Sequence, residues 1–234
     1  MKLEVNHLNK SYGERKILKD IDISFEDGKI YGLLGCNGAG KTTFFNALNE
    51  DIDIDSGKFF LETDFGKNLL HTKDIGYVLS TPIVPEFLTG REFLQFMLEI
   101  RGNQSSKTID ELFDLVKISK EDRNKLLKDY SLGMKNKIQI LVNVVSNPRI
   151  ILLDEPLTSL DIVVQEDMKK LLKKLKKDHI IILSTHILEL ALDLCDDIII
   201  LSNQSMRKIE KKQFHTKKFK DEIINQLKDD YYEK

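Results

Sequence analysis

The stretch that decides the fold is IYGLLGCNGAGKTTFFNAL, residues 30–48. It begins with the apolar run IYGLL and ends in an apolar helical pattern formed by Phe44, Phe45 and Leu48. Between them lies GCNGAGKT, which fits the pattern G-x-x-x-x-G-K-[ST] without a gap. A strand, a glycine-rich loop and a helix in this order predict a phosphate-binding loop. The alternative is a chance match in a glycine turn.

The chemistry of such a loop follows from its residue types. Glycines let the backbone curl so that several N–H groups face one point, and the helix N-terminus that follows favours an anion. Lys41 is expected to reach the β- and γ-phosphates as a flexible point charge, and the Thr42 hydroxyl can ligate Mg²⁺. The residues that we assign to this phosphate loop are Gly35, Cys36, Asn37, Gly38, Ala39, Gly40, Lys41, Thr42 and Thr43.

Composition bounds the class of protein. The 234 residues are 41% hydrophobic and 32% charged, which is an ordinary globular composition for one domain with an inserted lobe. The formal net charge of −2 argues against a dedicated nucleic-acid binder. No apolar run approaches the ~18 residues of a membrane span, and the N-terminus lacks the apolar region of a signal peptide. The two cysteines, Cys36 and Cys195, suggest neither a disulfide framework nor a metal site, so we expect a cytosolic protein.

The first thirty residues predict β-strands. One strand stops at the turn signal Glu26-Asp27-Gly28 and has alternating apolar residues, namely Ile17, Ile21, Ile23 and Phe25. Tyr12 precedes the glycine of the turn before it. Its ring can stack on a flat base, although its position alone favours an ordinary turn tyrosine.

The middle of the chain predicts a helical insertion. Strands are expected over residues 58–62 and 75–79, with residues 63–74 as a surface connection between them. Helical spacing then occurs twice, at Phe93, Phe96, Met97 and Ile100 and at Ile109, Leu112, Phe113 and Val116. We expect both apolar stripes to be core, within a helical lobe that covers about residues 88–145.

A serine-glycine turn lies inside this lobe. The sequence YSLGMK, residues 130–135, precedes a helix that we predict over Asn136 to Val145. Ser131 and free N–H groups at this turn can form a second small anion site. A routine helix N-cap is the favoured alternative on this pattern alone.

An acidic pair follows a buried strand. The run IILL at 150–153 is continuous and apolar, as in a strand buried on both faces, and Asp154-Glu155-Pro156 comes directly after it. Open α/β sheets bind ligands at the carboxyl ends of such strands. Asp154 is placed to hold Mg²⁺ through water, and Glu155 to orient or deprotonate an attacking water. A solvated strand end is the alternative.

Further polar residues are expected near the same edge. Ser159-Leu160-Asp161 precedes a helix, and an apolar strand over residues 179–183 leads into Ser184-Thr185-His186. His186 alone fits a helix cap. At the sheet edge that carries the acidic pair, it is predicted to contact a γ-phosphate.

These motifs, in this order, resemble the nucleotide-binding subunit of ABC transporters over roughly residues 1–210. The motifs that carry the resemblance are Gly35 to Thr43, SLGM at 131–134, LLDEP at 152–156, Ser159-Leu160-Asp161 and Ser184-Thr185-His186. The resemblance implies an α/β fold: a P-loop NTPase core with a mostly parallel central sheet, an N-terminal antiparallel β subdomain and the helical subdomain. It implies an ATP-binding domain at 1–212 and a short helical tail at 213–234, in which Ile223, Ile224 and Leu227 can pack on the body.

The resemblance also implies the roles of single residues. Tyr12 matches the aromatic residue that stacks on adenine, Asp154 the second metal-associated carboxylate, Glu155 the catalytic base and His186 the switch histidine. Lys41 and Thr42 match the phosphate-loop lysine and the Mg²⁺ ligand, respectively.

Two further motifs match regions that act between subunits. Ser131, Leu132, Gly133 and Met134 match the signature motif, which in this family closes over ATP bound to a second subunit. Ser159, Leu160 and Asp161 match the loop that crosses between subunits. The resemblance therefore implies a head-to-tail dimer with a copy of this chain or with a paralogue.

Three departures from the family pattern have consequences. Ser80 stands where a glutamine is usual, which predicts slow hydrolysis and loose coupling to the membrane partner. Tyr130 and Leu132 give the signature a form that resembles drug- and antimicrobial-peptide-exporter ATPases. Cys36 replaces the usual proline, and we predict a partly activated thiol there.

The expected function is ATP hydrolysis with Mg²⁺ that energises transport, with a lean towards export, through a separate transmembrane subunit. Its coupling helix would dock near Ser80 to Phe87, so the chain would be cytoplasmic and peripheral on the inner face of the membrane. No nucleic-acid partner is expected. Two alternatives are open: a soluble ATPase of the same superfamily acting on a non-transport partner, and a weakly hydrolysing, nucleotide-gated subunit.

Overall fold

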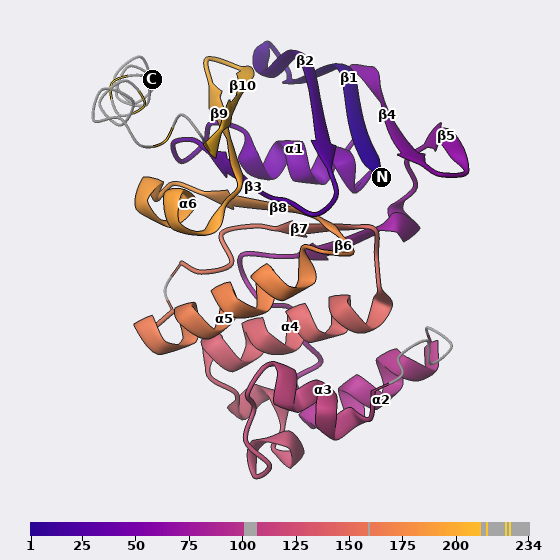
Figure 1. Cartoon of the computed structure of the whole chain (residues 1–234), viewed down its shortest axis with the longest axis vertical. Helices are drawn as coiled ribbons and strands as arrows, with labels where there is room; N and C mark the ends of the chain where they lie inside the picture. The colour runs from indigo at the N-terminus through magenta and orange to yellow at the C-terminus, as the bar shows by residue number, and fades with distance from the viewer. Residues whose placement is uncertain (101–106, 159, 212–213, 215–222, 224, 226–234) are drawn as a thin grey trace.

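Two sheets form the framework of the protein (Figure 1). The computed structural model describes residues 1–100, 107–158, 160–211, 214, 223 and 225. The N-terminal sheet is antiparallel with the order β2-β1-β4-β5, made of β1 (Lys2–Tyr12), β2 (Arg15–Glu26), β4 (Ser56–Thr63) and β5 (Gly66–Leu69). The second sheet has the order β10-β9-β3-β8-β7-β6, and only its β10–β9 pair is antiparallel. Its strands are β3 (Ile30–Leu34), β6 (Ile75–Val78), β7 (Ile150–Leu153), β8 (Ile180–Thr185), β9 (Asp197–Ser202) and β10 (Ser205–Glu210).

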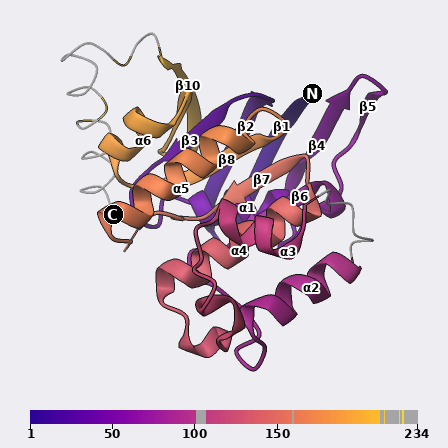
Figure 2. The ribbon, with the colours of Figure 1, turned by 60° about the horizontal axis from the view of Figure 1, so that its bottom comes forward.

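Helices cover both faces of the parallel sheet. Helix α1 (Lys41–Leu48) lies between the two sheets, and α4 (Leu132–Ser146), α5 (Ile162–Leu175) and α6 (Leu188–Leu194) lie on the opposite face (Figure 1). Helices α2 (Gly90–Ile100) and α3 (Ile109–Leu115) form a lobe that packs against α4 and projects away from the sheets (Figure 2). Short 3₁₀ turns are η1 (Thr72–Asp74), η2 (Asp122–Asn124) and η3 (Leu127–Asp129).

Strand alternation divides the interior into two hydrophobic cores. Every residue of β3 is buried, and its successive side chains point to opposite faces. Tyr31 and Leu33 join the core around α1 and the antiparallel sheet, whereas Ile30 and Leu34 join the core beneath α4, α5 and α6. The predicted α/β architecture, with an antiparallel subdomain and helices inserted between β6 and β7, is confirmed.

Two local expectations were wrong. The interval 63–74 is not a plain connection, because it contains β5, whose residues 66–69 pair with residues 60–63 of β4. All four residues of β5 are exposed, so no apolar alternation marks it in the sequence. In α2 the predicted stripe is only partly right: Phe93 packs against the core, but Phe96 and Ile100 are exposed. The fully buried row is Leu94 and Leu98, because the row that faces α4 is offset from the predicted stripe.

The start of one helix differs from expectation, whereas the described part of the tail agrees with it. The helix predicted from Asn136 begins earlier, at Leu132, directly after Ser131. In the predicted tail, Ile223 is fully buried in the core beneath α4, α5 and α6. Ile224 and Leu227 lie outside the described residues.

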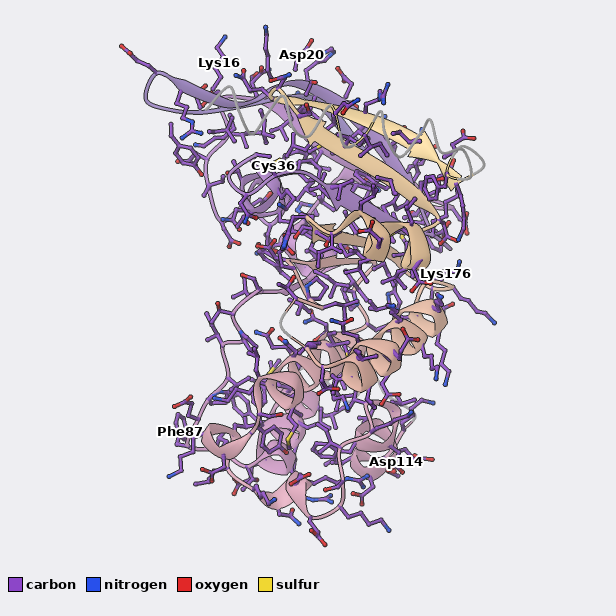
Figure 3. The ribbon with its side chains drawn as sticks, turned by 90° about the vertical axis from the view of Figure 1, so that its left-hand side faces the viewer. Lys16, Asp20, Cys36, Phe87, Asp114 and Lys176 are labelled. Atoms are coloured by element: carbon purple, nitrogen blue, oxygen red, sulfur yellow. The ribbon has the colours of Figure 1, made fainter. Side chains whose placement is uncertain are left out.

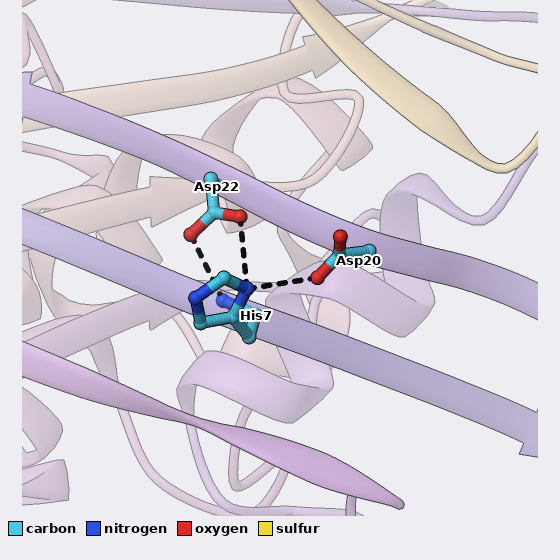
Figure 4. A group of neighbouring side chains, drawn as sticks. All are labelled: His7, Asp20 and Asp22. Atoms are coloured by element: carbon cyan, nitrogen blue, oxygen red, sulfur yellow. Dashed lines mark hydrogen bonds and ion pairs between the residues drawn. The ribbon is translucent and has the colours of Figure 1, made fainter.

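An ion-paired cluster marks a change of register between β1 and β2. The pairing shifts between Val5 and Leu8, and both His7 and Asp20 have left-handed backbone there. The Nδ1 atom of His7 lies 2.9 Å from Asp20 and 3.2 Å from Asp22 (Figure 4). The hydrogen bond with Asp20 raises the pKa of His7, so the imidazolium form is favoured at this exposed bulge.

Candidate functional site

Three neighbouring strands deliver the predicted site residues to one edge of the parallel sheet. Strand β8 lies between β3 and β7, and all three run in the same direction. Their carboxyl ends therefore lie side by side. Strand β3 leads into Gly35, β7 into Asp154 and β8 into His186. Strand β6 pairs with β7 on the far side and leads to Ser80. This is the edge at which open α/β sheets bind ligands.

The phosphate loop is shaped by its glycines. Gly40 caps α1 with φ 110°, a conformation that L side chains rarely adopt, and a Cβ there would lie 2.7 Å from Cγ2 of Ile17. The N–H of Ala39 donates to the carbonyl of Cys36, which closes the turn before the helix. The N-terminus of α1 therefore lies next to Ile17 of β2.

Lys41 is held inside the loop. It is only 6% exposed, and its Nζ donates to the carbonyls of Gly35 (2.8 Å) and Cys36 (3.2 Å). The same nitrogen lies 3.4 Å from Oε1 of Glu155. The buried ammonium is therefore stabilised by oxygen atoms on the side of the loop where an anionic ligand would bind.

Oxygen atoms suited to Mg²⁺ converge beside Lys41. The Thr42 hydroxyl donates to Oδ2 of Asp154 at 2.8 Å, and the Ser184 hydroxyl donates to Oδ1 of the same carboxylate at 2.6 Å. Asp154 is nearly fully buried. A hydroxyl and a carboxylate are the hard ligands that Mg²⁺ prefers, together with water and phosphate oxygens. The residues present fit this ion.

Hydrogen bonds to both its side chain and its backbone hold Glu155 in place. Its two carboxylate oxygens each lie 3.1 Å from Nδ1 of His186, and Oε2 accepts a hydrogen bond from the Thr158 hydroxyl at 2.8 Å. Its backbone N–H donates to Ser184 Oγ at 2.9 Å, and its φ of 48° is unusual for a residue other than glycine. A carboxylate in this position can accept a proton from a water molecule at the cavity.

These residues open on a cavity of about 280 Å³. It is lined by Arg15, Ile17, Asn37, Gly38, Gly40, Lys41, Thr42, Thr43, Ser80, Asp154 and Glu155. The sequence analysis did not place Arg15, Ile17 or Thr158 in this site, and it placed Ser184 at this edge without assigning it the hydrogen bond to Asp154. Ile17 was predicted only as one of the alternating apolar residues of its strand. Because side chains alternate along β2, Arg15, two residues before Ile17, is expected on the same face.

Tyr12 lies near the cavity but does not line it. Its ring is 51% exposed, and the ammonium of Lys10 lies 4.7 Å from the ring centroid. One face of the ring is thus covered by a cation. The prediction that Tyr12 stacks on adenine remains a prediction.

The signature turn lies in the helical lobe, outside the cavity lining. The Ser131 hydroxyl accepts a hydrogen bond from the N–H of Met134 at 3.2 Å, and Ser131 and Leu132 are exposed. A Cβ on Gly133 would meet Val164 of α5 at an ordinary 3.5 Å. The turn thus presents a hydroxyl and helix N–H groups outwards.

Tyr130 anchors this turn in the lobe. The ring is buried, and its hydroxyl donates to the carbonyl of Asp122 at 2.8 Å. Burial raises the pKa of Tyr130 to about 12, so the hydroxyl keeps the proton that it donates. A Cβ on Gly90 would lie 2.1 Å from that hydroxyl, so α2 must begin with glycine here.

Asp161 caps the start of α5. Asp161 accepts a hydrogen bond from the N–H of Val164 at 2.9 Å, as an N-cap residue does. Gln165 donates to the carbonyls of Leu157 and Leu160. Ser159 lies outside the described residues, so only Leu160 and Asp161 of this predicted motif are placed.

Cys36 offers a chemical test of the loop. It is a half-buried cysteine outside any disulfide in the described residues, and its carbonyl accepts a hydrogen bond from Lys41. Alkylation of its thiol is expected to block nucleotide binding, because the added group enters the loop, and bound ATP is expected to slow the labelling. Mass spectrometry of maleimide-treated protein measures both effects, with the buried Cys195 as internal reference. Equal labelling of Cys36 with and without ATP would contradict the prediction.

Comparison with known proteins identifies the family. The family model described as ABC transporter matches residues 18–158, which is more than half of the chain. The chain belongs to the ABC transporter family. It carries the ATP-binding cassette of that family, whose ATP-binding domains are ATPases.

Named relatives come from transport systems. The bacitracin transport ATP-binding protein BcrA of Enterococcus faecalis is 35% identical over 191 residues, 80% of this chain and 61% of that protein. The lantibiotic transport ATP-binding protein SrtF of Streptococcus pyogenes is 30% identical over 198 residues, 84% of this chain and 85% of that protein. The match thus spans less than two thirds of the length of the first relative.

A solved structure shows the same fold. The dimeric, post-hydrolysis structure of the ATP-binding cassette MJ0796 bound to ADP and Pi has a TM-score of 0.76 with 22% sequence identity. The match covers 91% of this chain and 100% of that chain. In the part of the chain that the structure describes, no helix combines the length and apolar character needed to cross a membrane.

Proposed function

We propose that this ATP-binding cassette hydrolyses Mg-ATP and thereby drives a separate transmembrane subunit that exports its substrate. The observation that carries the proposal is the convergence of Lys41, Asp154 and Glu155 on one cavity. Thr42 and His186 complete the set through hydrogen bonds to the two carboxylates.

Each group has a distinct task in phosphoryl transfer, where catalysis is mostly positioning and charge stabilisation. Mg²⁺ held near Thr42 and Asp154 would neutralise charge on the bound phosphates. Lys41 and the loop N–H groups bind the β- and γ-phosphates. Glu155 orients and deprotonates the attacking water, and His186 keeps Glu155 in place while facing the γ-phosphate.

The site is proposed to be completed by a second ATP-binding subunit, either a copy of this chain or a paralogue. Ser131 is exposed and is not among the residues that line the cavity of its own chain, so its hydroxyl and the N-terminus of α4 are available to the nucleotide of a partner. The dimeric state named for the cassette MJ0796 supports this arrangement. ATP bound between two subunits would hold them together, and hydrolysis would release them.

A membrane subunit is proposed to dock where the loop after β6 meets the helical lobe. Ile83 is 73% exposed and Phe87 is 78% exposed, and both lie in the segment that follows Ser80. Such apolar side chains fit a helix of a partner better than water. The chain would then lie on the cytoplasmic face of the membrane.

The cargo is proposed to be an antimicrobial peptide or a similar drug. The names of the bacitracin and lantibiotic relatives support this class, as does the YSLGM form of the signature.

Two alternatives differ in what they predict. A soluble ATPase of this superfamily would act on a non-transport partner and needs no membrane subunit. A weakly hydrolysing, nucleotide-gated subunit is favoured by Ser80, whose short hydroxyl lines the cavity where a glutamine amide is usual. Glu155 lines the cavity and His186 contacts its carboxylate, and the presence of both residues argues against the second alternative.

Co-purification separates the transport function from a soluble one. A tagged, full-length chain expressed in its own host is expected to recover an integral membrane protein after detergent extraction. Recovery that is lost on replacing Phe87 with aspartate, but kept when the still more exposed Phe65 is replaced in the same way, would locate the contact. Recovery of ribosomes or of a soluble scaffold without any membrane protein would contradict the proposal.

A further inference from the structure

The cavity contains a second cation with no assigned task. Arg15, the first residue of β2, lines it together with the phosphate loop and is exposed. Its guanidinium forms no ion pair or hydrogen bond with another residue that the structure describes. Lys41, in contrast, is buried and already bonded to loop carbonyls.

Arg15 lies on the face of β2 that is turned towards the cavity. Ile17 lies two residues further along the same face and packs on Gly40 of the phosphate loop. Arg15 pairs with Tyr12 across the turn between β1 and β2. Arg15 therefore joins the cavity lining from the turn between β1 and β2, where its strand partner is Tyr12.

We propose that Arg15 binds the phosphate next to the ribose of the bound nucleotide. The proposal rests on the proposed function, in which Lys41 holds the β- and γ-phosphates. A nucleotide with its terminal phosphates at Lys41 extends its ribose end towards the open side of the cavity, where Arg15 lies. The planar guanidinium presents several N–H donors and suits a phosphate oxygen pair better than any other side chain that lines the cavity.

The adjacent residue supplies a matched control. Lys16 carries the same charge, but strand alternation directs it to the other face of β2, and it does not line the cavity. Figure 3 shows Lys16 at the outer surface of the antiparallel sheet, while Cys36 of the phosphate loop lies beneath it. Both side chains are exposed, so neutralising either one leaves the core intact.

Calorimetric titration of the full chain with Mg-ATP and with Mg-ADP tests the proposal. Arg15→Gln is expected to lower the affinity for both nucleotides by about tenfold, because one charge-assisted hydrogen bond is lost. Lys16→Gln is expected to change either affinity less than about twofold, since a distant exposed charge is screened. Arg15→Lys should recover part of the affinity.

Three results would overturn it. The first is an Arg15→Gln protein that binds ADP as tightly as the parent. The second is a loss confined to ATP, which would assign Arg15 to the γ-phosphate. The third is an equal loss of affinity in the Lys16→Gln protein, which would mean that the net charge of the protein, and not a contact of Arg15, causes the effect. A parent protein that binds neither nucleotide would instead refute the proposed function itself.

Discussion

A Glu155→Gln protein is expected to bind Mg-ATP as tightly as the parent and to hydrolyse it at least about a hundredfold more slowly, the typical contribution of a positioned general base. The amide has the size of the carboxylate and can still accept the hydrogen bond from Thr158. It cannot take a proton from water. Binding is therefore kept while the chemical step is lost, and ATP should accumulate in a dimer.

Single-turnover phosphate release and size-exclusion chromatography in Mg-ATP measure the two effects. Glu166→Gln is the matched control, because Glu166 lies on the exposed side of α5 and pairs with Lys169. Its turnover should equal that of the parent. If the Glu155→Gln protein turns over as fast as the parent, Glu155 is not the base. If the parent binds ATP but hydrolyses it little or not at all, the result favours the nucleotide-gated alternative.

A Ser131→Arg protein is expected to keep its affinity for ATP and to lose about a hundredfold in turnover, the typical effect of removing a donor aimed at developing charge. Ser131 is exposed and does not line the cavity of its own chain, so nucleotide binding by the monomer has no reason to change. The long, charged side chain would keep the start of α4 away from the nucleotide of a partner. Steady-state hydrolysis and ATP titration, measured on the same preparation, separate these effects.

The same substitution at a serine outside the helical lobe controls for added charge. Ser205 is exposed on the edge strand β10 and far from the lobe in the sequence, so Ser205→Arg should behave as the parent does. A Ser131→Arg protein with full turnover would contradict the shared site. A Ser131→Arg protein with weakened ATP binding as a monomer would mean that the turn acts within its own chain.

The parts of the site that are contiguous in the sequence were predictable. The phosphate loop needs its glycines, Lys41 and Thr42 within eight residues, because the backbone that cradles phosphate is one turn. The same holds for Asp154 and Glu155, which must follow a buried strand. These residues lie together because β3, β7 and β8 are parallel neighbours, and such apolar runs indicate a parallel sheet.

What the sequence left open depends on contacts between distant segments. Arg15 and Thr42 meet at the cavity only because β2 packs over the loop, and no local pattern records that approach. In α2, helical spacing alone did not tell which row faces α4, and Leu94 and Leu98 occupy it instead of Phe96 and Ile100. Likewise β5 is an exposed edge strand whose pairing with β4 leaves no apolar alternation.

The most direct test of the account is the affinity for Mg-ATP of a Lys41→Ala protein. Lys41 is the buried cation of the phosphate loop, and each charge-assisted bond that it gives to phosphate contributes about 1.5–3 kcal/mol. With two phosphates held, the dissociation constant for ATP should rise about a hundredfold or more and hydrolysis should cease, while the protein stays folded by circular dichroism. A Lys41→Ala protein that binds and hydrolyses ATP as well as the parent would contradict the account.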